Sequence, residues 1–181
     1  GEYSALACSG AISFIETIKL LKIRGHAMQN AVPKNEGGML AILGENIIKV
    51  NDLLENNKNK FTCFLANDNS SGQIVISGKI HDLDQLINEL KNLNIKNIKL
   101  PVSAPFHCVL MNPATQIMRK QIMNTDFSQP KNEIISNVTA NASKDPQEIK
   151  KLLIEQIESP VRWRESIINM INVGNKKFIE I

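Results

Sequence analysis

The sequence has few cysteines and few aromatic residues, and each shortage excludes a class of protein. Its three cysteines, Cys8, Cys63 and Cys108, are odd in number and form no C-x-x-C motif. They therefore suggest neither a disulfide framework nor a zinc site, and they favour a reducing, cytoplasmic setting. Aromatic residues make up 4% of the chain and do not alternate with basic residues, which disfavours nucleic-acid binding.

Long apolar runs are also missing. No apolar stretch approaches the ~18 residues that a membrane-spanning helix needs, and no basic, apolar and small-residue signal opens the sequence. We therefore expect neither membrane insertion nor secretion. The 181 residues are 43% hydrophobic and 22% charged, which is typical of a soluble globular protein. The formal net charge of the chain is +3. Its small basic clusters are compatible with weak electrostatic attraction of phosphates and with an ordinary solvated surface.

The middle of the sequence, residues 37–102, reads as a compact unit. Apolar runs and turn signals predict strand, helix, strand, strand, helix and strand over residues 39–43, 47–56, 61–66, 73–77, 82–93 and 95–102. This order is that of the ferredoxin-like, split βαβ arrangement. Glycine and proline border the unit. We predict a ferredoxin-like (βαββαβ) subdomain inserted at residues 37–102.

The flanking residues 1–36 and 103–181 predict an α/β core. Before the insertion, apolar spacing predicts helix over residues 3–31, with a break at Ser9-Gly10 and Ser13 as a candidate cap of the second part. After it, the pattern predicts helices over residues 110–123, 145–158 and 161–171 and strands over residues 133–138 and 177–181. Asp145 is the expected cap of the second of these helices. Strands that alternate with helices indicate a parallel sheet, and too few strands are present to complete one.

His107 is the first candidate functional residue. It lies in the proline-punctuated turn at residues 101–108, just after an apolar run. The unperturbed pKa of histidine, near ~6.5, suits proton transfer at neutral pH. A capped or buried structural histidine fits the same position equally well, so the residue alone leaves both interpretations open.

Several ordered segments carry a resemblance to a known family. They lie at residues 1–10, 23–29, 67–78, 101–108, 135–140 and 160–166. In this order and spacing they resemble the malonyl-CoA:acyl-carrier-protein transacylases of the stand-alone bacterial type. The acyltransferase domain of a large multidomain synthase is a less similar alternative.

The resemblance implies an α/β-hydrolase-like core and an activity. The activity is transfer of a malonyl group from coenzyme A to acyl carrier protein, in fatty-acid biosynthesis, through a serine ester. It implies that His107 is the catalytic base and that Arg24 holds the malonyl carboxylate, although a solvated surface arginine is the ordinary alternative. Phe106 and Met28 would line the acyl pocket, and core packing explains either residue about as well. No metal or organic cofactor is implied, because the coenzyme A thioester is the substrate.

The nucleophile that the resemblance requires is not among these residues. In the family, a segment like Gly1-Glu2-Tyr3-Ser4-Ala5 ends a G-H-S-L-G-E-Y-S-A run, whose first serine attacks the thioester. That serine would precede Gly1, whereas Ser4 lies within the predicted helix. We therefore expect a sequence truncated at both ends that shows no turnover alone. A catalytically inactive remnant or binding protein that keeps the malonyl and carrier-protein site is the alternative.

Overall fold

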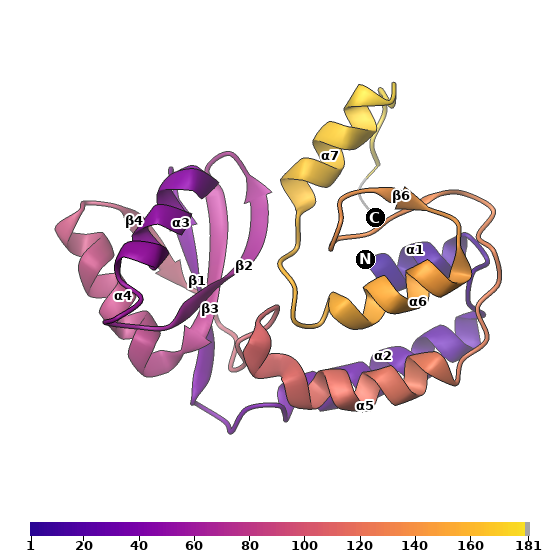
Figure 1. The fold of residues 1–181 in the computed structure, drawn as a ribbon, viewed down its shortest axis with the longest axis horizontal. Helices are drawn as coiled ribbons and strands as arrows, with labels where there is room; N and C mark the ends of the chain where they lie inside the picture. Colours follow the sequence, from indigo (N-terminus) through magenta and orange to yellow (C-terminus); the bar gives the residue numbers. More distant parts are fainter. Residues whose placement is uncertain (180–181) are drawn as a thin grey trace.

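The computed structural model describes residues 1–179, which form two groups of elements lying side by side (Figure 1). One group is a four-stranded sheet that carries two helices. The other group is mainly helical and contains residue 1. Helices and strands together make the chain an α/β protein, as the sequence predicts.

The sheet group follows the predicted order of elements. It consists of β1 (Gly37–Leu43), α3 (Ile47–Asn56), β2 (Cys63–Ser70), β3 (Gln73–Lys79), α4 (Ile80–Asn92) and β4 (Lys96–Lys99). The strand order is β2-β3-β1-β4, and every neighbouring pair is antiparallel. The central strands β1 and β3 pair along their whole length. The boundaries of the insertion at residues 37–102 stay a prediction.

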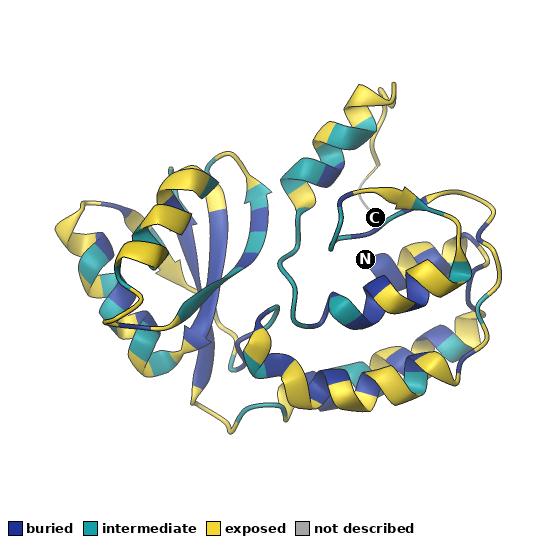
Figure 2. Cartoon of the chain, in the orientation of Figure 1, coloured by how far each residue is buried: buried dark blue, intermediate teal, exposed yellow. Residues whose placement is uncertain are grey.

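Both faces of the central strands are buried, which explains their nearly continuous apolar sequence (Figure 2). One face packs with α3 and α4 and contributes Leu40, Ile42, Ile74 and Ile76 to their shared core. The opposite face contacts Phe106 through a smaller cluster of Met39, Ala41, Ala66 and Val75. The sheet therefore supports the turn that carries His107.

β2 is longer than the sequence predicts. The composition of residues 68–72 predicts a turn, whereas β2 continues to Ser70, and only two residues connect it to β3. The backbone N–H of Asp68 donates to the carbonyl oxygen of Val161 at 2.9 Å. Shifts of the pairing register on either side of Asp68 indicate β-bulges, which keep this polar stretch in the sheet. Long-range partners, which composition does not reveal, override the turn preference here.

The helical group contains α1 (Glu2–Cys8), α2 (Phe14–Gln29), a 3-10 turn (Val109–Met111), α5 (Asn112–Met123), α6 (Pro146–Glu155) and α7 (Trp163–Asn172). Two predicted caps are present: Ser13 accepts a hydrogen bond from the N–H of Glu16, and Asp145 accepts one from the N–H of Gln147. α2 and α5 lie side by side (Figure 1) and share a core with α1 and α6. None of the helices among residues 1–179 is long and apolar enough to cross a membrane.

The helical group contains less sheet than its apolar runs predict. The predicted strand at residues 133–138 is reduced to β5 (Ile134–Ile135), which pairs antiparallel with β6 (Ala142–Ser143). Of the second predicted strand, residues 177–179 are not in a strand, and residues 180–181 lie outside the described residues. A strand forms only where a neighbour accepts and donates its hydrogen bonds, and an apolar run does not show whether such a neighbour is present.

Candidate functional site

A hollow of about 830 Å³ lies between α1, α6, α7 and the segment around β5, and we call it the central hollow. Its polar wall includes Glu2, Arg24, His107, Asn137 and Gln156, and its apolar wall includes Ile135, Trp163 and Met170. The two principal candidates from the sequence, Arg24 and His107, are therefore brought together on one cavity, although they come from distant parts of the chain.

Arg24 reaches the central hollow from the second half of α2. Its Nη2 donates a hydrogen bond to the side-chain Oε1 of Gln156 at 3.2 Å, and its guanidinium lies over the ring of Tyr3, 5.8 Å from the ring centre. Its Nε is buried and has no hydrogen-bond partner among residues 1–179. Burial lowers the pKa of Arg24, yet an arginine remains cationic at neutral pH. A cation with an unused buried donor is suited to bind an anion.

His107 enters the hollow from the turn that follows β4. Its φ of 59° lies in the left-handed region, which is uncommon for a residue other than glycine. Its Nδ1 lies 3.1 Å from the backbone oxygen of Gln156. Because a carbonyl oxygen only accepts hydrogen bonds, this contact places the proton on Nδ1 and makes Nε2 the basic nitrogen. Burial lowers the pKa of His107, so the ring is neutral and able to take up a proton at neutral pH.

The sheet group holds the turn that carries His107. The fully buried side chain of Ser77, on β3, donates a hydrogen bond to the carbonyl oxygen of Phe106. Gly37, at the start of β1, lies against Pro105, and a Cβ atom on Gly37 would come within 2.3 Å of the Cδ atom of that proline. These contacts fix the backbone immediately before the left-handed residue.

Three polar residues, Gln156, Glu2 and Asn137, join Arg24 and His107 in a network that the sequence did not reveal. The Nε2 of Gln156 donates to Oε2 of Glu2 at 2.7 Å, and Gln156 and Glu2 are only 6% and 9% exposed. Asn137 donates to the same oxygen of Glu2 at 2.9 Å. Burial raises the pKa of Glu2, and both amide donors oppose that shift by stabilising the carboxylate.

Little in the sequence indicates this network. Glu2 and Asn137 lie inside segments that carry the family resemblance, but a glutamate at a helix start and an asparagine in a loop are common surface residues. Gln156 lies just after α6, outside those segments. Its role depends on partners far away in the chain, and only the fold brings them together.

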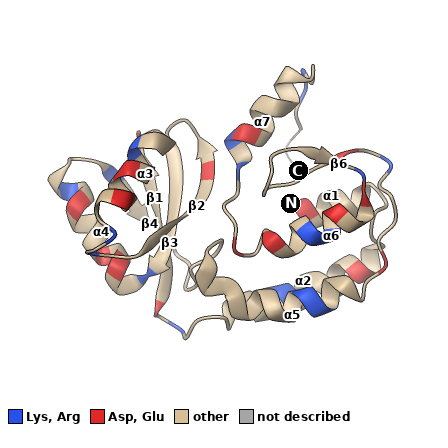
Figure 3. Ribbon diagram, viewed as in Figure 1, with Lys and Arg blue, Asp and Glu red and all other residues tan. Residues whose placement is uncertain are grey.

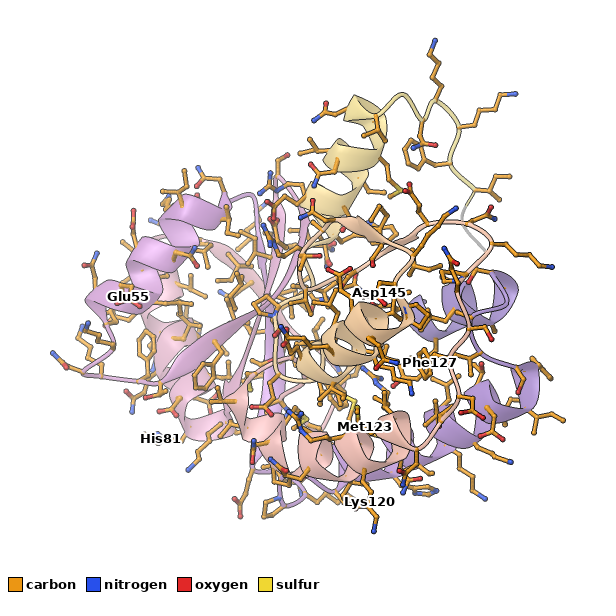
Figure 4. All side chains as sticks on the ribbon, turned by 45° about the vertical axis from the view of Figure 1, so that its right-hand side comes forward. Glu55, His81, Lys120, Met123, Phe127 and Asp145 are labelled. Atoms are coloured by element: carbon orange, nitrogen blue, oxygen red, sulfur yellow. The ribbon has the colours of Figure 1, made fainter. Side chains whose placement is uncertain are left out.

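Neither of the two predicted pocket residues is among those that line the central hollow. Met28 is buried in the helical core, and Phe106 packs between that core and the sheet. Their contact with an acyl group stays a prediction. The other histidines, His26 and His81, are exposed, and His81 lies at the outer edge of the sheet group (Figure 4). Both rings are therefore accessible to solvent, and neither lines the central hollow.

Charged residues of opposite sign are interspersed along the helices (Figure 3). Lys19, on α2, pairs with Glu16 at 2.7 Å. Arg164, on α7, holds the buried carboxylate of Asp68 through both of its oxygens, at 2.7 to 3.0 Å, and so ties α7 to β2. Within the described part of the chain, no group of three or more His, Cys, Asp or Glu residues is arranged to hold a metal ion.

Comparisons with known proteins find relatives along the whole chain. Residues 1–181 match the acyl transferase domain family. The chain is 42% identical over 186 residues to the malonyl CoA-acyl carrier protein transacylase of Bacillus subtilis (strain 168), covering 100% of this chain and 58% of the relative. It is 35% identical over 182 residues to the protein of the same name from Salmonella typhimurium, covering 100% of this chain and 59% of the relative.

Solved structures show the same similarity. The malonyl CoA-acyl carrier protein transacylase from Coxiella burnetii superimposes with a TM-score of 0.93 at 39% identity, covering 97% of this chain and 56% of that one. A malonyl-transacylase in complex with a type II PKS acyl-carrier protein superimposes with a TM-score of 0.91 at 32% identity, covering 96% of this chain and 57% of that one. The likeness confirms the α/β fold class. The chain spans about 58% of the length of the curated relatives named above.

Proposed function

Because the chain belongs to the acyl transferase domain family, we propose that it provides the base and the carboxylate-binding arginine of a malonyl-CoA:acyl-carrier-protein transacylase. One observation carries the proposal: Arg24, with an unused buried Nε, and His107, with a basic Nε2, lie on the wall of one hollow. A malonyl thioester has a reactive carbonyl at one end and a free carboxylate at the other. Its transfer therefore needs both functions in one site.

His107 acts as the base in both halves of the transfer. Its Nε2 removes the proton of the attacking serine hydroxyl, and the thiol of coenzyme A leaves with that proton as the serine ester forms. In the second half, Nε2 takes the proton of the carrier-protein thiol, and the serine oxygen recovers it as the new thioester forms. The bond from Nδ1 to Gln156 keeps the ring in the tautomer that these steps require. We assign the serine to the G-H-S-L run that the resemblance places before Gly1.

Arg24 binds the malonyl carboxylate. A guanidinium offers two parallel N–H groups to a carboxylate, which fixes both its position and its orientation. The contact with Gln156 holds the guanidinium in place, and the buried Nε remains available to the ligand. Because an acetyl group has no carboxylate, this interaction selects malonyl thioesters over acetyl thioesters.

The substrates are then malonyl-CoA and acyl carrier protein, with no cofactor beyond the coenzyme A that the substrate brings. We place the protein in the cytoplasm, with no nucleic-acid or membrane partner. The cysteine pattern supports this location, since Cys8, Cys63 and Cys108 are all free thiols.

The test is the substrate preference of an Arg24→Ala variant. It is made in the polypeptide translated from the whole reading frame that contains residues 1–181, which we call the full-frame polypeptide. Losing one partner of a buried charged pair costs about 2–5 kcal/mol, so the preference for malonyl-CoA over acetyl-CoA should fall by about thirtyfold or more. The measurement is the ratio of kcat/KM for the two thioesters.

A matched control is Arg119→Ala, which removes an exposed arginine from α5. That variant should keep the malonyl preference of the unaltered protein. An unchanged preference in Arg24→Ala would contradict the role of Arg24. If the full-frame polypeptide does not accept a malonyl group at all, the proposed function is wrong.

A further inference from the structure

One residue, Gln156, contacts both functional residues of the central hollow. Its side-chain Oε1 accepts the hydrogen bond from Arg24, and its backbone oxygen accepts the one from His107. The other polar group of its side chain, Nε2, donates to Glu2. The orientation of the Gln156 amide therefore determines whether Arg24 has an acceptor at this point.

Glu2 determines that orientation. A carboxylate only accepts hydrogen bonds, so it takes the Nε2 end of the Gln156 amide and leaves the Oε1 end facing Arg24. If the amide were turned over, two donors would face each other at Arg24 and two acceptors would face each other at Glu2. Both contacts would be lost at once.

Glu2 is itself held in place. Asn137 donates to the same carboxylate oxygen that Gln156 uses. No lysine or arginine among residues 1–179 forms a salt bridge with Glu2, and the residue is nevertheless only 9% exposed. Burying a carboxylate is costly unless hydrogen bonds compensate for the lost water. Packing alone therefore gives no reason for a glutamate at this position.

We propose that Glu2 is a positioning residue for substrate selection, which fixes the amide of Gln156 so that Arg24 is held ready for the substrate carboxylate. The inference rests on the proposed function and adds a residue that acts through Gln156 without touching substrate. Arg24 depends on the side chain of Gln156, whereas His107 depends on its backbone. Loss of Glu2 should therefore impair recognition of malonyl more than proton transfer.

The experiment compares Glu2→Ala and Glu2→Gln in the full-frame polypeptide. Glu2→Ala should lower the preference for malonyl-CoA over acetyl-CoA about tenfold, as expected for loss of a hydrogen bond to a charged group, mainly by raising KM for malonyl-CoA. Glu2→Gln keeps a side-chain oxygen that can accept from both amides, so it should retain most of the preference. The matched control is Glu16→Ala, which removes a first-turn glutamate that pairs with exposed Lys19.

Two results would overturn the proposal. In the first, Glu2→Ala lowers kcat/KM for both thioesters by the same factor, which is what a purely structural role predicts. In the second, Glu2→Gln loses as much of the malonyl preference as Glu2→Ala does. That result would show that an acceptor oxygen at this position does not hold Gln156.

A separate readout keeps this inference distinct from the proposed function. If the unaltered polypeptide takes no malonyl group, the proposed function fails, and hydrogen exchange of the Arg24 Nη2–H group that bonds to Gln156, measured by NMR, decides the role of Glu2. Exchange should be slow in the unaltered protein and in Glu2→Gln and faster in Glu2→Ala. Equal exchange in all three would show that Glu2 does not position Arg24.

Discussion

The sheet group and the central hollow are stabilised in different ways. The core between the sheet and its two helices is apolar, and Leu40, Ile42, Ile74 and Ile76 are completely buried in it. The hollow is bordered by charged and amide side chains that each depend on one or two directional contacts. Apolar burial contributes in proportion to area and tolerates small shifts, whereas a hydrogen bond depends on the placement of two atoms. Changes in the sheet should therefore cost stability, and changes at the hollow should cost activity.

The largest effect should follow substitution of His107. In the full-frame polypeptide, His107→Asn removes the proposed base, and asparagine tolerates the left-handed backbone found at this position. Turnover should fall by about 10²–10⁴-fold, the usual contribution of a general base, with little change in the urea midpoint of unfolding. Turnover within a few-fold of the unaltered protein would show that another group is the base.

The complementary effect on stability should follow substitution in the sheet group. Leu86, on α4, is completely buried, so Leu86→Ala should lower the free energy of unfolding by about 2–5 kcal/mol. Urea unfolding measures this loss, and the folded fraction should keep its malonyl preference. Leu93, which is 52% exposed, provides the control, because Leu93→Ala should leave stability nearly unchanged. Equal losses in the two variants would contradict the assigned core.

Ser77 belongs to the sheet group, but its substitution should affect activity. It lies on β3, yet its hydroxyl holds the carbonyl that precedes His107. Ser77→Ala should lower kcat by about tenfold, in line with an unsatisfied buried carbonyl near the base, and leave the malonyl preference intact. The control Ser71→Ala changes an exposed residue of the same sheet hairpin. If Ser77→Ala loses stability but keeps full kcat, the sheet does not position the turn.

The smallest effect is a shift in pH dependence. Burial lowers the pKa of His107 below the ordinary histidine value of 6.5, so the ring remains neutral at pH values somewhat below 6.5. The acid limb of kcat/KM should therefore lie below pH 6.5. Over the same range the unfolded chain binds the proton more readily than the folded one, so the contribution of His107 to stability is present above pH 6.5 and is lost below it. An acid limb above pH 6.5 would contradict this environment for the ring.

The apolar parts of the fold were predictable from the sequence. The alternation of apolar runs with turn residues predicted the order of elements in the sheet group, and the caps at Ser13 and Asp145 followed from local hydrogen-bonding chemistry. These features depend on neighbours within a few residues. The polar end of β2 and the short β5 were not predicted, because their pairing is decided by distant segments.

The candidate site was predictable only in part. Arg24 and His107 were found because they lie in segments that resemble a family, and the structure places both on the central hollow. Glu2 and Gln156 are separated by most of the chain and touch only in the fold. No periodicity or composition signal records such a contact, so the network that orients Arg24 could not be derived from the sequence.

The central claim is that this chain carries the base and the carboxylate site of a malonyl transfer. It is tested most directly by the intact mass of the full-frame polypeptide after brief incubation with malonyl-CoA, beside its Arg24→Ala and His107→Asn variants. We predict a gain of one malonyl unit in the unaltered polypeptide and a much slower gain in both variants. An unaltered polypeptide that gains no mass, or variants that gain it equally fast, would contradict the account.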